Sequence, residues 1–267
     1  MNEDLQVTIA ADGVMHIELC RPDAKNALTI EMRDGIVRAL VEARSNVAVR
    51  AVLITAAGDA FCAGMDLTAS TVMQAGRDDF RPRMTSEALR IGVQAFIKAL
   101  WELDKPTVAA VHGAAVGPGA HLALACDFVI VQPRTKFVWT FPKWGLVVDA
   151  GGAYLLPRLV GLAKAKALVM LGESINGEDA VNLGLAHQCV SADNVAAIAQ
   201  QLASRLAAGP TRSLGLSKRL LNATFETDLN TSLELEGHFQ ALATASPDLL
   251  EGMAAFREKR DAAFNGD

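Results

Sequence analysis

The sequence predicts an α/β domain followed by a helical extension, and three observations carry that prediction. Short β-branched runs at 49–55, 107–111 and 128–131 are bounded by turn residues, which is typical of buried strands. Amphipathic runs with helical spacing lie between strands. The end of the chain carries one helical pattern after another. We therefore expect an α/β core over residues 1–191 and a helical region over 192–267, within one domain.

The elements can be placed along the chain in order. Apolar and polar residues alternate over 14–19, which predicts a strand. Thr29 is a suitable N-cap for an amphipathic helix over 30–43. The polar segment 69–83 predicts a mobile loop that could cover a site, and a helix over 86–103 follows it. Four helices are expected in the helical region, at 195–206, 211–223, 229–243 and 247–264.

Composition and charge exclude several classes of protein. The chain is 51% hydrophobic and 21% charged, with a formal net charge of -5, which is ordinary for a soluble globular protein. A sequence pI near 5.6 provides no global field that would attract nucleic acid or anionic lipid. The first residues lack a basic leader, and no apolar run approaches the ~18 residues that span a bilayer. We expect a cytoplasmic protein that binds neither nucleic acid nor membrane.

The cysteine pattern predicts thiols rather than a metal site. The four cysteines are far apart and flanked by apolar residues: Cys20, Cys62, Cys126 and Cys189. There is no CxxC pair and no cluster of histidines. Buried, reduced thiols are therefore expected, and no metal is expected.

Two glycine-bearing turns follow strands and are candidates for ligand contact. One covers residues 60–67, and the other covers 112–121, directly before an apolar helix over 122–126. Glycine lets the backbone approach a ligand, and the amides of a helix N-terminus attract negative charge. Neither turn matches a P-loop or a GxGxxG motif. For each turn taken alone, a tight strand-to-helix connection is the simpler interpretation.

Asp149 is the most unusual carboxyl of the sequence. It stands among apolar residues, directly before a predicted helix. An isolated carboxylate is costly there unless it caps the helix or takes part in chemistry. The local sequence slightly favours capping and leaves both interpretations open.

Taken together and in this order, these segments resemble the crotonase superfamily, also called the enoyl-CoA hydratase/isomerase family. The matching segments run nearly end to end: 21–28, 61–67, 105–106, 113–127, 149–157, 161 with 165 onward, 180–185 and 251–260. The resemblance implies a ClpP-like spiral of ββα units with a C-terminal helical trimerisation region. It implies a homotrimer or a dimer of trimers, a role such as fatty acid metabolism, and an acyl-CoA ligand. Coenzyme A then enters as part of the substrate, with no permanently bound cofactor.

The family's shared chemistry is an oxyanion hole, in which two backbone N–H groups bind the thioester oxygen and stabilise an enolate. Each such donor contributes on the order of 3–4 kcal/mol to catalysis. The resemblance assigns the donors to the amides of Met65 and of position 118. That position is Pro118, which has no N–H. The second donor is therefore missing or is supplied by a neighbour such as Gly119.

Two glutamates of enoyl-CoA hydratases are not matched in this chain. His121 and Phe141 stand at those positions, and no glutamate occurs over 103–172. Hydration by the two-glutamate mechanism is therefore not expected. The setting of Asp149 instead resembles dienoyl-CoA and ring-opened phenylacetyl-CoA isomerases, in which an aspartate at this place shuttles a proton. A dehalogenase of 4-chlorobenzoyl-CoA is disfavoured, because the places of its histidine and tryptophan hold Gln94 and Phe141.

We therefore expect isomerisation of an unsaturated acyl-CoA, with Asp149 as the proton shuttle and the thioester oxygen held at Met65. One alternative is an acyl-CoA-binding homologue with little or no catalysis. Another is an atypical enoyl-CoA hydratase in which His121 and Asp149 replace the glutamates. His121 is either a second catalytic residue or a polar residue of the pocket wall.

The resemblance also implies the ligand contacts. Coenzyme A is expected to contact Lys25, Ala27, Ala63, Met65, Asp66, Leu67, Phe256 and Lys259. The last two would reach the nucleotide from a neighbouring subunit, although a solvated helix face is an alternative for Lys259. The acyl pocket is expected to include the 69–83 loop, Trp139, Phe141 and Trp144.

Overall fold

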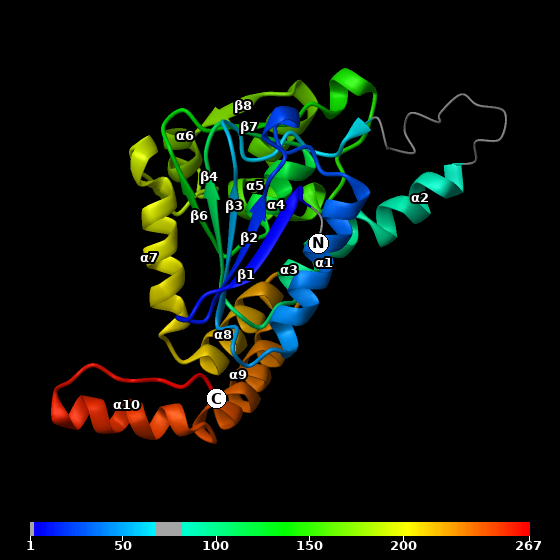
Figure 1. Cartoon of the computed structure of the whole chain (residues 1–267). Helices are drawn as coiled ribbons and strands as arrows, with labels where there is room; N and C mark the ends of the chain where they lie inside the picture. The colour runs from blue at the N-terminus through cyan, green and yellow to red at the C-terminus, as the bar shows by residue number, and fades with distance from the viewer. Residues whose placement is uncertain (1–2, 68–81) are drawn as a thin grey trace.

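A six-stranded sheet lies at the centre of the computed structural model, which describes residues 3–67 and 82–267 (Figure 1). In spatial order the strands are β1 (Leu5–Ile9), β2 (Val14–Leu19), β3 (Ala51–Ala56), β4 (Thr107–Val111), β6 (Phe128–Val131) and β9 (Gln188–Cys189). Strand β1 is antiparallel to β2, and the remaining neighbours are parallel. The parallel order fits the buried, β-branched runs expected from the sequence.

The described residues also form the helices that connect and cover these strands. The α-helices are α1 (Ile30–Ser45), α2 (Pro82–Ile91), α3 (Val93–Trp101), α4 (Pro118–Leu124), α5 (Gly152–Leu171), α6 (Gly177–Asn182), α7 (Val195–Ala207), α8 (Thr211–Ala223), α9 (Leu229–Thr244) and α10 (Pro247–Glu258). Short 3₁₀ turns occur at η1 (Pro22–Ala24), η4 (Phe141–Trp144) and η5 (Ala192–Asn194). The side chain of Thr29 caps α1 by accepting from the N–H of Met32, as the sequence predicts.

A second, three-stranded sheet turns the chain into a spiral. Strand β5 (Ala114–Val116) pairs in parallel with β7 (Lys136–Val138), and β8 (Ser174–Asn176) pairs antiparallel with β7. The chain runs from β4 through β5 to α4, and then from β6 through β7 to α5. Each pass therefore adds one strand to each sheet and then a helix, which is the arrangement that a spiral of ββα units requires.

Both faces of the large sheet are buried. On one face Leu53 and Ile130 belong to an apolar cluster with α7. On the other face Ile54 and Val111 belong to the main core, together with α1, α3 and α4. Figure 1 shows α7 on one side of the sheet and α1 and α3 on the other. A parallel sheet covered in this way has no polar face, which explains the uninterrupted apolar runs of its strands.

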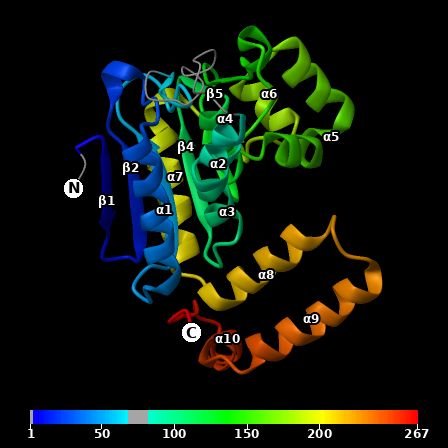
Figure 2. The same ribbon diagram turned by 90° about the vertical axis from the view of Figure 1, so that its right-hand side faces the viewer.

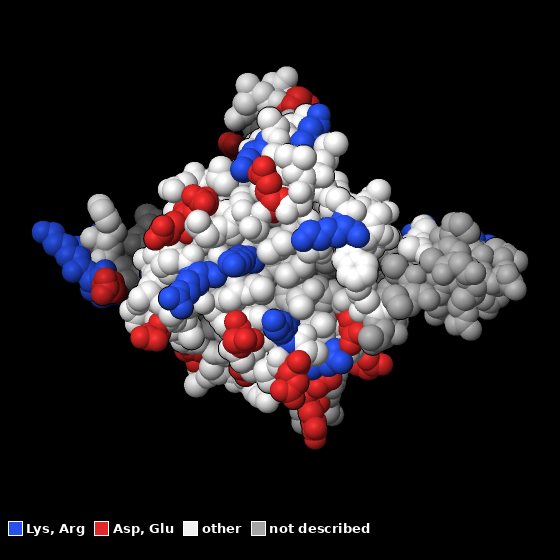
Figure 3. All heavy atoms as spheres, turned by 90° about the horizontal axis from the view of Figure 1, so that it is seen from above, with Lys and Arg blue, Asp and Glu red and all other residues white. Residues whose placement is uncertain are grey.

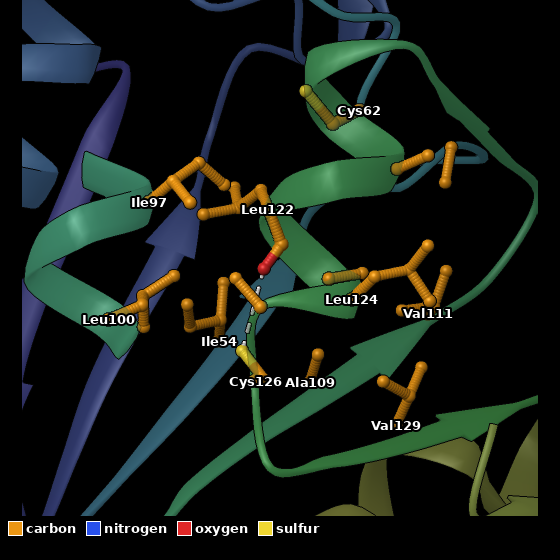
Figure 4. Close-up of a cluster of buried hydrophobic side chains, with 14 of the residues drawn as sticks. Ile54, Cys62, Ile97, Leu100, Ala109, Val111, Leu122, Leu124, Cys126 and Val129 are labelled. Atoms are coloured by element: carbon orange, nitrogen blue, oxygen red, sulfur yellow. Dashed lines mark hydrogen bonds between the residues drawn. The ribbon is translucent and has the colours of Figure 1, made fainter. Parts of the chain in front are cut away.

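Helix α4 is anchored in the main core. Figure 4 shows its side chains filling the space between Ile97 of α3 and the strand residues Ile54 and Val111. The thiol of Cys126 donates to the carbonyl oxygen of Leu122 at 3.6 Å. Burial of a large apolar side chain stabilises a fold by roughly 1.5–3 kcal/mol. The position of α4 is therefore fixed by packing.

The segment before β4 differs from the expectation. The single helix expected over 86–103 is two helices, α2 and α3. They are separated at Gly92, whose φ of -102° and ψ of -110° are not helical. The loop expected over 69–83 lies outside the described residues up to position 81, and α2 begins at Pro82.

The helical region expected over 192–267 divides into two parts. Helix α7 packs on the large sheet through Val195 and Leu202, whereas α8, α9 and α10 lie beyond one end of the sheet (Figure 2). The last helix, expected over 247–264, ends with α10 because Lys259 adopts a left-handed φ of 54°.

All four cysteines are free thiols. Cys62 and Cys126 are buried as expected, whereas Cys20 and Cys189 are only partly buried. Burial raises the pKa of Cys62 and of Cys126 to about 12, so both thiols stay protonated at neutral pH.

The surface shows no strong charge of one sign on the face seen in Figure 3. Lysines and arginines are interspersed with aspartates and glutamates over the described part of that face. Among residues 3–67 and 82–267, no helix is long and apolar enough to cross a membrane.

Lys218 ties α8 to the core. Its ammonium group donates to the Asp127 carboxylate at 2.9 Å and to the carbonyl oxygens of Leu100 and Lys105 at 3.2 and 3.3 Å. The Lys218 side chain is 8% exposed and that of Asp127 is 21% exposed. Asp127 also accepts from the N–H and hydroxyl of Thr107, at 2.8 and 2.9 Å. This ion pair is therefore largely shielded from water and fully hydrogen-bonded at the ammonium.

We expect Lys218→Met to lower the free energy of unfolding by about 3 kcal/mol, because it leaves the Asp127 charge without its cation. Urea unfolding at pH 7 measures this. Lys164→Met is the matched control, since the Lys164–Glu173 pair is about 40% exposed on both sides; a loss of at most about 1 kcal/mol is expected there. Equal losses in the two variants would contradict the structural role of Lys218.

Candidate active site

A cavity of about 370 Å³ lies where several of these elements converge. Its walls include segment 63–67, the first turn of α1, one face of α2 and the first residue of α3. Residues from segments 116–118 and 140–149 complete them. Most of the wall is apolar. The sequence-predicted residues on it are Ala63, Met65, Asp66, Leu67, Pro118, Phe141, Trp144 and Asp149.

Backbone pairing fixes the direction of the Met65 N–H. Leu28 donates its N–H to the carbonyl oxygen of Gly64 at 2.7 Å, and Asp66 donates its N–H to the carbonyl oxygen of Leu28 at 2.9 Å. Peptide groups of successive residues in an extended chain point to opposite sides. The N–H of Met65 therefore turns away from Leu28. Because Met65 lines the cavity, its N–H is a candidate backbone donor for a ligand there.

The start of α4 forms the neighbouring part of the wall. Gly117 is its N-cap, with a left-handed φ of 49°, and its N–H donates to the carbonyl oxygen of Val138 at 2.8 Å. Pro118 takes the first helical position, where a missing N–H breaks no helical bond. Gly119, expected as a substitute donor, is fully buried and does not line the cavity. The backbone of Gly119 packs closely against Cys62, because a Cβ added at Gly119 would lie 2.5 Å from the Cys62 carbonyl oxygen.

Asp149 lies on the cavity wall in the turn before α5. The N-cap of α5 is Gly151, and no side chain caps this helix. The N–H of Gly152 donates to the backbone carbonyl of Asp149 at 2.9 Å, not to its carboxyl. The capping interpretation of Asp149 is therefore wrong, and its side chain is left for another role.

The surroundings of the Asp149 carboxyl favour its protonated form. The residue is half-buried, and its Oδ1 is buried without a hydrogen-bond partner in the described structure. Burial raises the pKa of Asp149 from 3.8 to about 6, and its own backbone N–H lowers it by less. No charged side chain of the described residues contributes to this pKa. A carboxyl that changes protonation state this close to neutral pH suits general acid–base catalysis.

His121 is fully buried on α4 and does not line the cavity. Its ring is stacked with that of Phe141, with centroids 6.0 Å apart and planes 9° apart. The indole N–H of Trp139 donates to its Nε2 at 3.0 Å. Burial lowers the pKa of His121 to about 4, and the backbone carbonyl of Asp149 opposes this more weakly. The imidazole is therefore neutral at physiological pH.

The remaining predicted residues lie away from the cavity wall. Trp139, expected in the acyl pocket, is fully buried and does not line the cavity, and its indole N–H bonds to His121. Lys25 is exposed beside the cavity, and its carbonyl oxygen accepts from the N–H of Ala63 at 2.9 Å. Ala27 lies on the same segment and does not line the cavity.

Two predicted contacts belong to the C-terminal helices. Phe256 lies on α10, and Lys259 directly follows that helix. Neither residue lines the cavity, and Figure 2 shows α10 beyond the end of the sheet, away from α2 and α4. Phe256 is 85% exposed. It borders a larger hollow of about 820 Å³ among α8, α9 and α10, which contains none of the acid–base candidates.

Sequence reasoning missed several residues of the cavity wall. Thr85, Ala88 and Leu89 line it from α2, at the three- and four-residue spacing of one helix face. That spacing is visible in the sequence, but nothing in it shows which wall the face meets. Arg33 of α1 also lines the cavity, and its guanidinium is bonded to Asp34 at 2.8 Å.

Comparison with known proteins identifies the family of the chain. The family model described as enoyl-CoA hydratase/isomerase matches residues 10–267. The chain is 39% identical over 258 residues to the 1,2-epoxyphenylacetyl-CoA isomerase of Escherichia coli (strain K12), covering 95% of each chain. It is 32% identical over 247 residues to the crotonyl-CoA hydratase of Syntrophomonas wolfei, covering 91% of each.

Solved structures agree with this assignment. The crystal structure of an enoyl-CoA hydratase from Polaromonas sp. JS666 superposes with a TM-score of 0.89 at 32% identity, covering 97% of this chain and 99% of that one. The chain therefore belongs to the enoyl-CoA hydratase/isomerase family. The resemblance stated from the sequence and the crotonase fold expected from it are confirmed, and the protein is an enzyme of this family.

The pKa of Asp149 predicts how the Asp149→Asn variant changes stability with pH. Because the folded protein holds this carboxyl at a pKa of about 6 instead of 3.8, ionisation costs the folded state about 3 kcal/mol at pH 7. That cost is absent well below pH 3.8, is still small at pH 4 and is fully developed once the pH has risen above about 6. We expect Asp149→Asn to be more stable than the parent at pH 7 and little changed at pH 4.

Thermal unfolding between pH 4 and pH 8 measures this difference. Asp193→Asn, at an exposed position, is the control and should follow the parent at every pH. If the stability difference between Asp149→Asn and the parent does not grow with pH, the raised pKa is contradicted.

Proposed function

We propose that the protein moves the double bond of an unsaturated acyl-CoA, with Asp149 transferring the proton. The observation that carries this proposal is a half-buried carboxyl on the cavity wall with a pKa of about 6 and no charged partner. A group of this kind can take up a proton and release it again within one catalytic cycle. The isomerase name of the Escherichia coli relative supports the same reaction class.

The reaction proceeds in two proton transfers on a 3-enoyl-CoA. The Asp149 carboxylate removes a proton from the carbon next to the thioester. The C–H electron pair enters the conjugated system, and negative charge develops on the thioester oxygen, toward which the Met65 N–H donates. The Asp149 carboxylic acid then returns the proton to the far end of the original double bond. The double bond moves next to the thioester, and no atom is gained or lost.

Two observations support isomerisation over hydration. Addition of water needs a group that activates the water, and His121, at one of the expected positions, is buried away from the cavity. The other carboxyl of the described cavity wall belongs to Asp66, which is paired with Arg21 at 2.6 Å. Asp149 is then left as the carboxyl with acid–base capacity.

Coenzyme A is proposed to lie along segments 25–27 and 63–67. The two segments are joined by the bond between the Lys25 carbonyl and the Ala63 N–H. Lys25 is exposed beside the cavity, where its ammonium can pair with a phosphate of the ligand.

We further propose that the protein is cytoplasmic and forms a trimer or a dimer of trimers. Helices α8–α10 are the proposed contact region, because they expose the apolar side chains of Leu221, Leu229 and Phe256 at 72%, 72% and 85%.

Replacement of Asp149 by asparagine tests the proposed chemistry. We expect Asp149→Asn to lower kcat on a 3-enoyl-CoA by roughly 100-fold or more, because asparagine cannot accept the proton. For the parent, activity should rise as the pH passes through about 6, where the carboxylate forms. Ultraviolet absorbance of the conjugated product and deuterium uptake from deuterated water give the two readouts.

Asp193→Asn again serves as the control and should retain the parental rate. Retention of the rate in Asp149→Asn would contradict the shuttle. So would rapid hydration of crotonyl-CoA by the parent, with a turnover on the order of 10 per second.

Binding of the ligand is tested independently of turnover. Calorimetry with crotonyl-CoA and with free crotonate should detect binding of the thioester only, and Lys25→Ala should weaken that binding. The effect of Lys25→Ala should shrink as salt is raised, since an exposed ion pair is screened. Lack of binding of any CoA thioester at millimolar concentration would rule out the proposed ligand class.

A further inference from the structure

A buried pair of side chains, His121 and Trp139, lies directly behind the turn that carries Asp149. Both side chains are fully buried, and their bond joins Nε1 of the indole to Nε2 of the imidazole at 3.0 Å. The imidazole also packs closely against the Asp149 turn. A Cβ added at Gly152 would lie 2.2 Å from its Cε1 and 2.3 Å from its Nε2, so that only glycine permits this approach.

The bond from Trp139 determines the protonation state of the ring. An indole N–H donates and cannot accept, so the Nε2 of His121 must be the acceptor. A neutral imidazole carries one proton, and that proton is therefore on Nδ1. Trp139 thus holds His121 in a single tautomer, with a donor at Nδ1.

Each of the two neighbouring residues has one unsatisfied polar atom. Nδ1 of His121 and Oδ1 of Asp149 are both buried and lack hydrogen-bond partners in the described structure. The first is a donor in the tautomer that Trp139 imposes, and the second is an acceptor. The backbone carbonyl of Asp149 is close enough to the ring to influence it. An unpaired buried polar group is costly, and one bond between these two atoms would satisfy both.

We propose that His121 is a positioning residue for Asp149. Trp139 fixes it as the Nδ1–H tautomer, and this N–H bonds to the Asp149 carboxylate when the carboxylate forms. The bond aims the other carboxylate oxygen into the cavity. His121 does not touch the substrate, and it does not carry the transferred proton.

A neutral donor suits this role. A cation at the same place would hold Asp149 ionised and lower its affinity for the proton it must carry. Among the described residues of α4, β7, η4 and the turn before α5, no charged side chain contributes to the ionisation of His121 or Asp149. Besides the backbone N–H of Asp149 itself, the proposed donor that orients the carboxylate is the N–H of His121.

Nitrogen-15 NMR of the parent protein tests the tautomer without any substrate. Between pH 5.5 and pH 8 we expect the Nδ1 of His121 to be protonated and its Nε2 to be unprotonated. Trp139→Phe removes the indole donor and should allow the proton to move to Nε2. A protonated Nε2 in the parent, or an imidazolium at pH 7, would overturn the proposal.

Two matched variants test the positioning role. An asparagine amide can reach the place of Nδ1, whereas the longer glutamine reaches the place of Nε2. We expect His121→Asn to keep kcat within about 3-fold of the parent and His121→Gln to lower it by roughly 10- to 100-fold, with little change in KM. The pH midpoint of activity should rise in His121→Gln, because the carboxylate has lost its donor, and stay near the parental value in His121→Asn.

Equal kcat values and equal pH midpoints in the two variants would refute positioning. The kinetic part rests on the proposed isomerisation. If no substrate turns over, that function fails, and the NMR experiment with the pH dependence of unfolding still decides the tautomer and its effect on Asp149. Loss of folding in His121→Gln likewise leaves the decision to the NMR of the parent.

Discussion

The cavity depends on the backbone pairing of the turn that contains Met65. On one side this turn pairs with Leu28, and on the other Cys62 pairs in parallel with Ala115. Three segments far apart in the sequence are thereby held by bonds between main-chain groups, whose geometry does not vary with side-chain rotamers. The Met65 N–H is left unpaired by Leu28, and Met65 lines the cavity. A donor held this rigidly needs no reorganisation when charge develops on a substrate oxygen.

Apolar packing sets the electrostatic character of the site. Burial raises the pKa of Asp149 and lowers that of His121, so both groups favour their neutral forms. Ionisation of either group costs the folded state free energy, but the two costs appear at opposite ends of the pH range. Neutral His121 stabilises the folded state fully above pH 6.5, and that contribution is lost as the pH falls toward 4. Ionised Asp149 destabilises it as the pH rises from about 4 to 6. Hence the site carries little charge until Asp149 ionises.

Local pattern was sufficient to predict the long and strongly periodic elements. Strands 14–19, 107–111 and 128–131 have the expected bounds, because a buried strand needs an unbroken apolar or alternating run. The strands of the small sheet have three residues each, too few for any periodicity to be visible. The break at Gly92 also escaped prediction, since isolated glycines occur within helices as well as at their ends.

Site residues could be predicted where a side chain is energetically unfavourable among its sequence neighbours. They were harder to predict where the position of a side chain depends on a partner far away in the sequence. Asp149 was notable because a lone carboxylate among apolar residues demands a reason. Trp139 was expected in the pocket with its aromatic neighbours, yet its indole N–H needs an acceptor when buried, and His121 supplies it from another element. That pairing has no local signature in the sequence. The same contact removes His121 from the cavity wall.

Pro118 is the last feature to reconcile with catalysis. Without an N–H at this position, the Met65 N–H is the one oxyanion donor that we propose. One missing donor costs on the order of 3–4 kcal/mol when an enolate carries its charge on oxygen alone. Proton removal from a 3-enoyl-CoA gives a dienolate, whose charge is shared between the oxygen and the carbon at the far end of the chain of double bonds. Less charge then gathers on the oxygen, and less stabilisation is needed there. In the proposed reaction, the carbon that gains charge is the one to which Asp149 returns the proton. The proposed site, with one donor and a carboxyl of raised proton affinity, would therefore suit the proposed movement of a double bond better than chemistry that concentrates charge on the thioester oxygen.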